Sequence, residues 1–174
     1  KALIATYAIP DPGCGAGSDV RPFGVKYNKG ALYVGVICSG QAVATNMNMY
    51  VYKFSGGTFT SVLNDDLIYP KGWVHATYAT PPVICSSWET WTDNFVDIHA
   101  AGSSSAGPRW CRPQAMLSDI EFDVDGTMIL GFADRTGHQL GYLQRNPANT
   151  TTGNGYIGGE ILRTNNLGNG NFTL

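Results

Sequence analysis

The densest group of side chains that could bind a metal lies between residues 119 and 126. Carboxylates recur there at Asp119, Asp123 and Asp125, and Gly126 follows directly. Closely spaced carboxylates are ligands that calcium prefers, but the terminal Glu of an EF-hand loop is missing. An Asp-Gly pair after an apolar run is also typical of a hairpin turn. We favour the turn and keep calcium, the one candidate cofactor, as the alternative.

Opposite charges follow the next apolar run, at Asp134 and Arg135, with His138 close behind. If the pair is partly buried, each charge would be satisfied by the other or by neighbouring backbone groups. The functional alternative is a ligand site lined by these three residues, with His138 as an acid or base. With Asp119 they would form the site of a hydrolase or lyase. We favour the structural interpretation, because the sequence has neither a GxSxG nucleophile motif nor the histidine spacing of a zinc site.

Aromatic residues gather in the middle of the chain, where all four tryptophans lie: Trp73, Trp88, Trp91 and Trp110. Exposed aromatic rings stack on sugars or anchor partner proteins. Buried rings would instead form a small core beneath a disulfide, which is the interpretation that we favour. A carbohydrate- or protein-binding module that uses this aromatic segment is the alternative function.

Cysteine spacing predicts disulfides. Cys14, Cys38, Cys85 and Cys111 are even in number and lack the CxxC spacing of metal or redox sites. We favour the pairs Cys14–Cys38 and Cys85–Cys111, while the two other connectivities stay open. Each favoured pair closes a loop of about 25 residues and contributes on the order of 3 kcal/mol. Disulfides persist outside the reducing cytosol, so we expect an exported protein, extracellular or at the cell surface.

The composition predicts an all-β fold. Of the 174 residues 43% are apolar, 14% are charged and 22 are Gly, a set that favours strands and tight turns over helices. The net charge of −2, without a basic run, argues against nucleic-acid binding. No apolar run approaches the roughly 20 residues of a transmembrane helix, so we expect no membrane span.

Strand signals occur as hairpins. Residues 23–38 and 48–63 each contain two strands around a Gly-containing turn, which together predict a four-stranded antiparallel meander. Residues 120–132 repeat the pattern, and we expect further strands at Gln139–Leu143 and Gly158–Arg163 to complete a second unit.

An internal repeat relates the first hairpin to the later one, because two pairs of glycines share an offset of 96 residues: Gly30 with Gly126 and Gly35 with Gly131. Units of roughly 40 to 50 residues with four strands each are typical of β-propeller blades. We therefore predict a β-propeller-like fold of about two blades, an incomplete ring. The expected parts are an opening strand and first blade (1–68), a disulfide-bridged insertion rich in Trp and Cys (69–114), and a second blade (115–174).

Two blades cannot close a ring, so strand edges would stay unpaired. We expect other protein chains, or the remainder of a longer polypeptide, to cover these edges. The chain begins without Met, and we expect it to be part of a longer protein. Two tripeptides, Asn149-Thr150-Thr151 and Asn171-Phe172-Thr173, match the N-glycosylation sequon.

Four stretches carry a resemblance to a known family: residues 21–24, 30–38, 50–52 and 116–139. The last is the most specific and reads MLSDIEFDVDGTMILGFADRTGHQ. Together they resemble the N-terminal propeller-like region of large exported bacterial cell-surface proteins, a region often followed by serine-aspartate-repeat B modules. The resemblance implies export, a multi-bladed propeller and a structural or adhesive role. The expected function is therefore a non-enzymatic extracellular structural or adhesive module.

Overall fold

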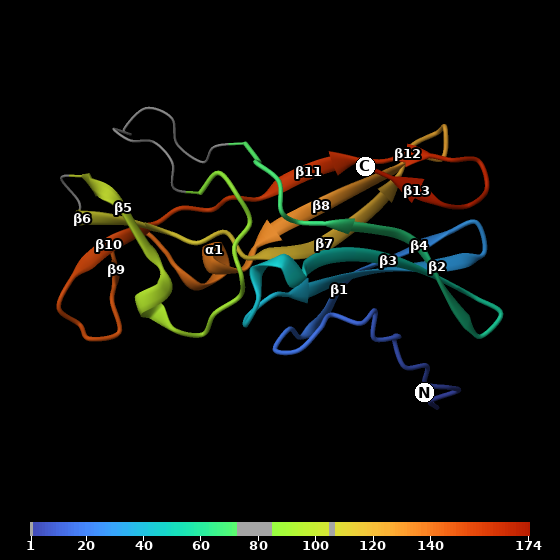
Figure 1. Ribbon diagram of the computed structural model, residues 1–174, viewed down its shortest axis with the longest axis horizontal. Helices are drawn as coiled ribbons and strands as arrows, with labels where there is room; N and C mark the ends of the chain where they lie inside the picture. Colours follow the sequence, from blue (N-terminus) through green and yellow to red (C-terminus); the bar gives the residue numbers. More distant parts are fainter. Residues whose placement is uncertain (1, 73–84, 105–106) are drawn as a thin grey trace.

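The computed structural model describes residues 2–72, 85–104 and 107–174 (Figure 1). The fold is all-β with antiparallel sheets, as the composition predicted. A short helix α1 (Arg135–Gln139) and the 3-10 turns η1 (Ala44–Asn46) and η3 (Phe95–Asp97) interrupt the strands. The strands are β1 (Val20–Asn28), β2 (Ala31–Ser39), β3 (Met47–Ser55), β4 (Thr58–Asp66), β5 (His99–Ser104), β6 (Gly107–Cys111), β7 (Ala115–Phe122), β8 (Met128–Asp134), β9 (Gln144–Arg145), β10 (Thr152–Gly155), β11 (Glu160–Arg163), β12 (Asn165–Asn166) and β13 (Phe172–Thr173).

The first sheet is the predicted meander, with strand order β1-β2-β3-β4. Its two outer hairpins turn at Lys29-Gly30, with φ of 45° and 83°, and at Gly56-Gly57, with φ of 57° and 85°. Two consecutive positive φ angles are the mark of the type I′ turn, whose twist matches that of the paired strands. Both hairpins that the sequence predicted are thus confirmed.

The second sheet has the order β11-β8-β7. It confirms the predicted hairpin around Asp125-Gly126 and the predicted strand before Arg163, which pairs with β8. The predicted strand at Gln139–Leu143 is wrong, because α1 occupies its first residue. α1 begins at Arg135, where the Asp134 side chain accepts a hydrogen bond from the Thr136 N–H and so satisfies a free donor of the first turn; the helix ends at Gln139, and residues 140–143 are not in a strand.

The two sheets pack face to face and share one hydrophobic core (Figure 1). Leu117 and Leu130 of the second sheet are fully buried, like Ile37, Met49 and Val51 of the first. In the described part of the chain the sheets form a sandwich of this kind, so the propeller prediction is not supported. The two sheets turn apolar faces toward each other, and this arrangement buries both of these faces.

The glycine repeat has a different meaning in this sandwich. Gly35 lies on the inner face of β2, where a Cβ would come within 2.6 Å of the Leu117 side chain. Gly131 lies beside Asp119, an exposed residue, where a Cβ would be 3.2 Å from the Asp119 Cβ. The two glycines therefore face different environments, and their shared offset does not indicate equivalent blades.

The sheets approach most closely where β1 meets β7. Each strand has a register shift there, between Pro22 and Val25 in β1 and between Leu117 and Asp119 in β7. Gly24 lies within the first shift, and a Cβ on it would be 2.9 Å from the Leu117 carbonyl oxygen. Glycine therefore permits a backbone contact that ties one edge of the sandwich together.

The later part of the N-terminal segment, from Tyr7 to Cys14, lies against the outer face of the first sheet (Figure 1). Ile9 contacts the cluster of Val34, Val36 and Tyr52, and the ring of Tyr7 lies 4.7 Å from that of Phe54. The predicted Cys14–Cys38 disulfide is confirmed and fixes this segment to β2, with the two Cα atoms 5.2 Å apart.

A third sheet, with strand order β5-β6-β10-β9, lies at one end of the sandwich (Figure 1). It combines strands of the predicted insertion with strands of the predicted second blade, and β6 pairs with β10 in parallel. The predicted Cys85–Cys111 disulfide is confirmed and joins the start of the segment before this sheet to the end of β6.

Candidate functional site

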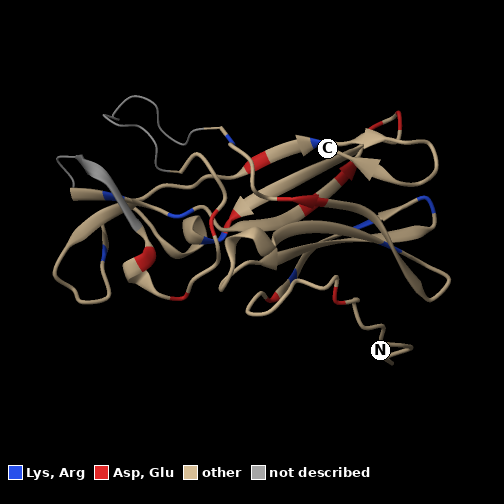
Figure 2. Ribbon diagram, in the orientation of Figure 1, with Lys and Arg blue, Asp and Glu red and all other residues tan. Residues whose placement is uncertain are grey.

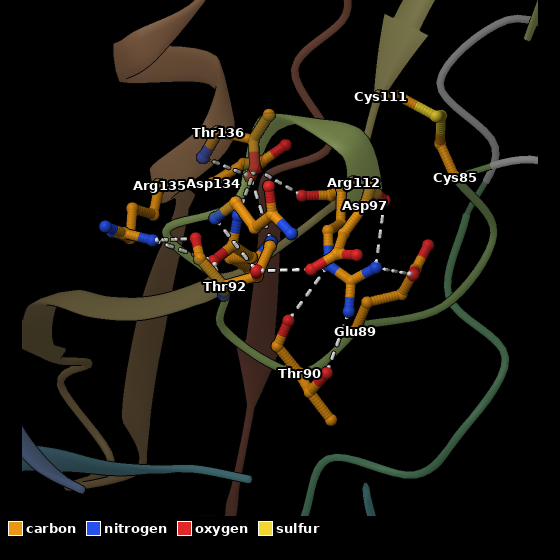
Figure 3. A network of polar contacts seen from close by, with 12 residues as sticks. Cys85, Glu89, Thr90, Thr92, Asp97, Cys111, Arg112, Asp134, Arg135 and Thr136 are labelled. Atoms are coloured by element: carbon orange, nitrogen blue, oxygen red, sulfur yellow. Dashed lines mark hydrogen bonds and ion pairs between the residues drawn. A yellow bond between two sulfur atoms is a disulfide. The ribbon is translucent and has the colours of Figure 1, made fainter. Parts of the chain in front are cut away.

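Buried polar side chains concentrate where the third sheet meets the sandwich (Figure 3). We call this group the junction network and define it as Thr92, Arg112, Gln114, Asp134, Arg135 and Thr136. These residues come from the segment after Cys85, the link between β6 and β7, the end of β8 and the start of α1. Gln114, Asp134 and Thr136 have no exposed surface.

Asp134 is the centre of the junction network. Its Oδ1 accepts hydrogen bonds from the backbone N–H groups of Gln114 (3.0 Å) and Thr136 (2.9 Å), and its Oδ2 accepts one from Gly158 (3.0 Å). Burial raises the pKa of Asp134, while these three donors and the charge of Lys71 oppose the shift. One carboxylate thus holds together the start of β7, the start of α1 and the segment before β11.

Neutral side chains continue the network. Gln114 Oε1 accepts hydrogen bonds from the Thr92 N–H (2.8 Å) and from the Arg135 Nη1 (2.9 Å), and its Nε2 donates to Thr136 Oγ1 (2.6 Å). Thr136 Oγ1 donates in turn to the Arg112 carbonyl at 2.5 Å. Both carboxamide atoms of Gln114 are therefore satisfied inside the protein, as buried polar groups require.

Two arginines hold the segment after Cys85 in place. Arg135 donates to the Thr92 carbonyl (2.7 Å), pairs with Asp93 and lies 4.8 Å from the centre of the Trp91 ring. Arg112 donates to the Thr90 carbonyl (3.0 Å), the Thr90 hydroxyl (2.8 Å) and the Asp97 carbonyl (3.0 Å). A planar guanidinium suits such multiple contacts. Arg135 of the predicted charged pair is thus bound to Asp93 rather than to Asp134.

The four candidate catalytic residues do not share one surface. Asp134 is buried, whereas Asp119 and His138 are exposed. Asp134 pairs across the sheet with Ala115, and Asp119 lies four residues further along β7, a distance of about 13 Å at 3.3 Å per residue. This separation leaves no position from which one substrate atom could reach both carboxylates. Figure 2 shows acidic and basic residues dispersed over the strands and loops.

The described tryptophans are buried. Trp88, Trp91 and Trp110 expose 3%, 7% and 5% of their surface, and Trp73 lies outside the described residues. Trp110 meets Phe95 edge to face at 5.1 Å, beside the Cys85–Cys111 disulfide. Their ring faces are packed against protein, which leaves them unavailable for stacking on a sugar.

A second buried polar group surrounds Lys71, which sequence reasoning missed. Its Nζ donates to the Gly158 carbonyl at 2.5 Å and lies 4.6 Å from the centre of the Trp88 ring. Tyr69 donates to Glu160 at 2.8 Å and accepts a hydrogen bond from Trp88 at 3.1 Å. Burial lowers the pKa of Lys71, and burial together with the Glu160 hydrogen bond raises that of Tyr69. The cluster connects the segment after β4 to β11.

Two carboxylates of the alternative calcium site, Asp123 and Asp125, contact an arginine. Arg163 Nη2 lies 3.0 Å from Asp123 Oδ2 and 2.8 Å from Asp125 Oδ2. Asp125 Oδ1 accepts the Thr127 N–H at 2.9 Å, and the hydrogen bonds from Thr127, followed by the charge of Arg163, hold the pKa of Asp125 below its usual value. Asp119 lies in β7, four residues before Asp123, which directly follows the strand; four extended residues span about 13 Å. No cluster of three metal-binding side chains occurs among the described residues.

We expect calcium to leave the thermal stability of the chain unchanged. A site occupied at one hundred times its Kd would add about 2.7 kcal/mol, which raises Tm by roughly 5–10 °C at this chain length. Arg163 already forms ion pairs with both Asp123 and Asp125, so thermal unfolding with calcium chloride or with EDTA should give the same Tm. Magnesium chloride at equal ionic strength is the control. A saturable rise in Tm that Asp125→Asn abolishes would contradict this.

A surface cleft of about 330 Å³ opens beside the junction network, between the segment around η3 and the segment from α1 to β9. Hydroxyl and carboxamide groups of Thr92, Asn94, Gln139 and Gln144 alternate there with apolar groups. Such a lining can donate to and accept hydrogen bonds from a neutral polar ligand. The complete lining is Thr92, Asp93, Asn94, Phe95, Ile98, Thr136, Gln139, Leu140, Gln144, Arg145 and Pro147. No motif marks the cleft, because its residues come from two distant segments.

No helix in the described ranges is both long and apolar enough to cross a bilayer. No family model matches the chain, and no solved structure matches it. Over 131 residues, which are 74% of this chain, it is 30% identical to Colossin-C of Dictyostelium discoideum. The match spans only 12% of the length of that protein.

Proposed function

We propose that the chain is a non-enzymatic structural module of a longer extracellular protein, of the adhesion type. The observation that carries the proposal is the burial of Asp134, Gln114 and Thr136 at the centre of the junction network. Its carboxylate, Asp134, accepts three backbone hydrogen bonds and has no exposed surface. The polar side chains of the junction network, which could otherwise take part in chemistry, therefore hold loops against the sandwich.

Two further observations support this proposal. Both disulfides are typical of proteins that fold in an oxidising compartment. The similarity to a segment that makes up 12% of Colossin-C suits a module within a long polypeptide. The resemblance to exported bacterial surface proteins, carried by residues 116–139, favours the same role. On this proposal the remainder of the longer chain is the first partner of the module.

Pulling single molecules from both ends tests the structural role. We expect the oxidised chain to unfold in one cooperative force peak, because a single core joins both main sheets. The disulfides prevent extension of the chain between the paired cysteines, whose sequence separations are 24 and 26 residues. Reduction should therefore lengthen the unfolded chain by about 170 Å. Extension of the oxidised chain without a force peak would contradict a structural module.

A second candidate function rests on the cleft beside the junction network. Its lining combines hydroxyl and carboxamide groups with the charged residues Asp93 and Arg145, a set that suits a carbohydrate or a polar peptide segment, which is the binding role considered for the aromatic segment. A glycan array probed with the folded chain tests it. Binding that is lost in Gln139→Ala with Gln144→Ala, but kept in Asn64→Ala on the exposed side of β4, would support this role. The same signal from all three proteins would contradict it.

A further inference from the structure

The two sequon asparagines both lie in short exposed hairpins. Asn149 is in the connection between β9 and β10, and Asn171 precedes β13. The acceptor of an N-linked glycan is an Asn in Asn-X-Ser/Thr, and the attached glycan needs space on the surface. Exposure of the acceptor nitrogen and of the hydroxyl two residues later is therefore the structural requirement.

Asn149 meets this exposure requirement because neighbouring residues bind the backbone of its loop and leave its side chain exposed. Asn146 Oδ1 accepts the N–H groups of Thr150 (2.8 Å) and Thr151 (3.2 Å), and the Asn149 N–H donates to the Asn146 carbonyl at 2.8 Å. Arg145 donates to the Asn149 carbonyl at 3.1 Å. Asn149 has a φ of 57° and is exposed, as is Thr151. In the described part of the chain, hydrogen bonds engage the backbone of Asn149 and leave its carboxamide in solvent.

Asn171 meets the same exposure requirement because side chains along β13 alternate between the buried and the exposed face. Phe172 is 8% exposed and packs in the main core, 6.3 Å from the ring of Phe122. Residues on either side of a buried strand residue point to the opposite face, so Asn171 and Thr173 share the outer face, and both are exposed. Phe172 can therefore stay buried while a glycan on Asn171 extends into solvent.

Both disulfides indicate that the chain folds in an oxidising compartment. In a eukaryotic cell that compartment is also where N-linked glycans are added. The two hairpins lie toward opposite ends of the long axis (Figure 1), so two glycans would not compete for space. The Asn149 hairpin includes Arg145 and Pro147, which line the cleft, whereas the Asn171 hairpin is remote from it.

We propose that Asn149 and Asn171 are acceptor sites for N-linked glycans. The donor is an oligosaccharide joined to a lipid through pyrophosphate. The Nδ2 atom of the asparagine forms a bond to the anomeric carbon, the bond from that carbon to the pyrophosphate oxygen breaks, and the amide loses one proton as the lipid pyrophosphate leaves. No oxidant or reductant takes part.

Secretion from cultured eukaryotic cells tests the proposal. The intact mass of the secreted, disulfide-bonded chain should exceed the polypeptide mass by two glycans. An amidase that releases N-linked glycans converts each occupied Asn to Asp, so peptide mapping should show Asp at positions 149 and 171. A secreted chain with the unmodified polypeptide mass would overturn the proposal, and Asn retained at one position would overturn it for that site.

Variants separate the two sites. Asn149→Gln and Thr151→Ala should each remove the first glycan, whereas Thr151→Ser should keep it because Ser supplies the same hydroxyl. Asn171→Gln should remove the second glycan. Asn64→Gln, at an exposed asparagine outside any sequon, is the matched control and should keep both. A two-glycan mass in the double variant Asn149→Gln with Asn171→Gln would overturn the assignment.

Discussion

Asp134→Ala should lower the free energy of unfolding by about 4 kcal/mol. The substitution leaves three buried backbone N–H groups, those of Gln114, Thr136 and Gly158, without an acceptor. Each unsatisfied buried donor costs about 1–3 kcal/mol, and the cavity left by the carboxylate adds to the loss. Since a whole domain is stable by about 5–15 kcal/mol, this one change should shift the midpoint of urea unfolding strongly.

Two variants make this measurement specific. Asp134→Asn keeps the volume and one acceptor oxygen, so we expect a smaller loss of roughly 2 kcal/mol. Asp119→Ala removes an exposed carboxylate from the same sheet and should stay within about 0.5 kcal/mol of the wild type. Equal stability of Asp134→Ala and Asp119→Ala would show that the junction network does not hold the two parts of the fold together.

Local features of the fold could be predicted because short-range chemistry decides them. The Lys29-Gly30 and Gly56-Gly57 turns require positive φ at adjacent positions, which Gly favours, and the flanking alternation sets the strands. The arrangement of the sheets could not be predicted in this way. The apolar residues of β8 look the same from sequence whether they face a neighbouring blade or the opposite sheet. Packing of Leu117 and Leu130 against distant residues of β2 and β3 determines that β8 faces the opposite sheet.

The candidate site was predictable in part for a related reason. Asp134 and Arg135 stand out as adjacent opposite charges, but adjacent residues point in different directions from an extended strand end, so each binds other groups. Asp134 accepts hydrogen bonds from backbone N–H groups, and Arg135 pairs with Asp93. No sequence motif identifies Gln114 and Thr136. The hydrogen bonds of a neutral side chain matter for the fold only when burial removes the water that it would otherwise bind.

Removal of the Cys85–Cys111 disulfide by Cys85→Ser with Cys111→Ser should cost about 3.5 kcal/mol. This is the chain-entropy value for the 26-residue separation. Cys14→Ser with Cys38→Ser is the matched control, since its separation of 24 residues predicts a nearly equal loss. The total free energy of unfolding therefore cannot distinguish the two disulfides. They are distinguished by which part of the protein loses stability.

Amide hydrogen exchange should place the two losses in different parts of the protein. Cys85 has a φ of 81°, a conformation that residues with side chains rarely adopt, so its segment should relax once the bond to β6 is gone. Faster exchange is then expected in β6, in β10 and around Thr92, while β2 and β3 stay protected because the main core is intact. The control pair should instead release the N-terminal segment from β2. Uniform acceleration in both variants would mean that the third sheet and the sandwich unfold as one unit, and that the junction network couples them more strongly than either disulfide does.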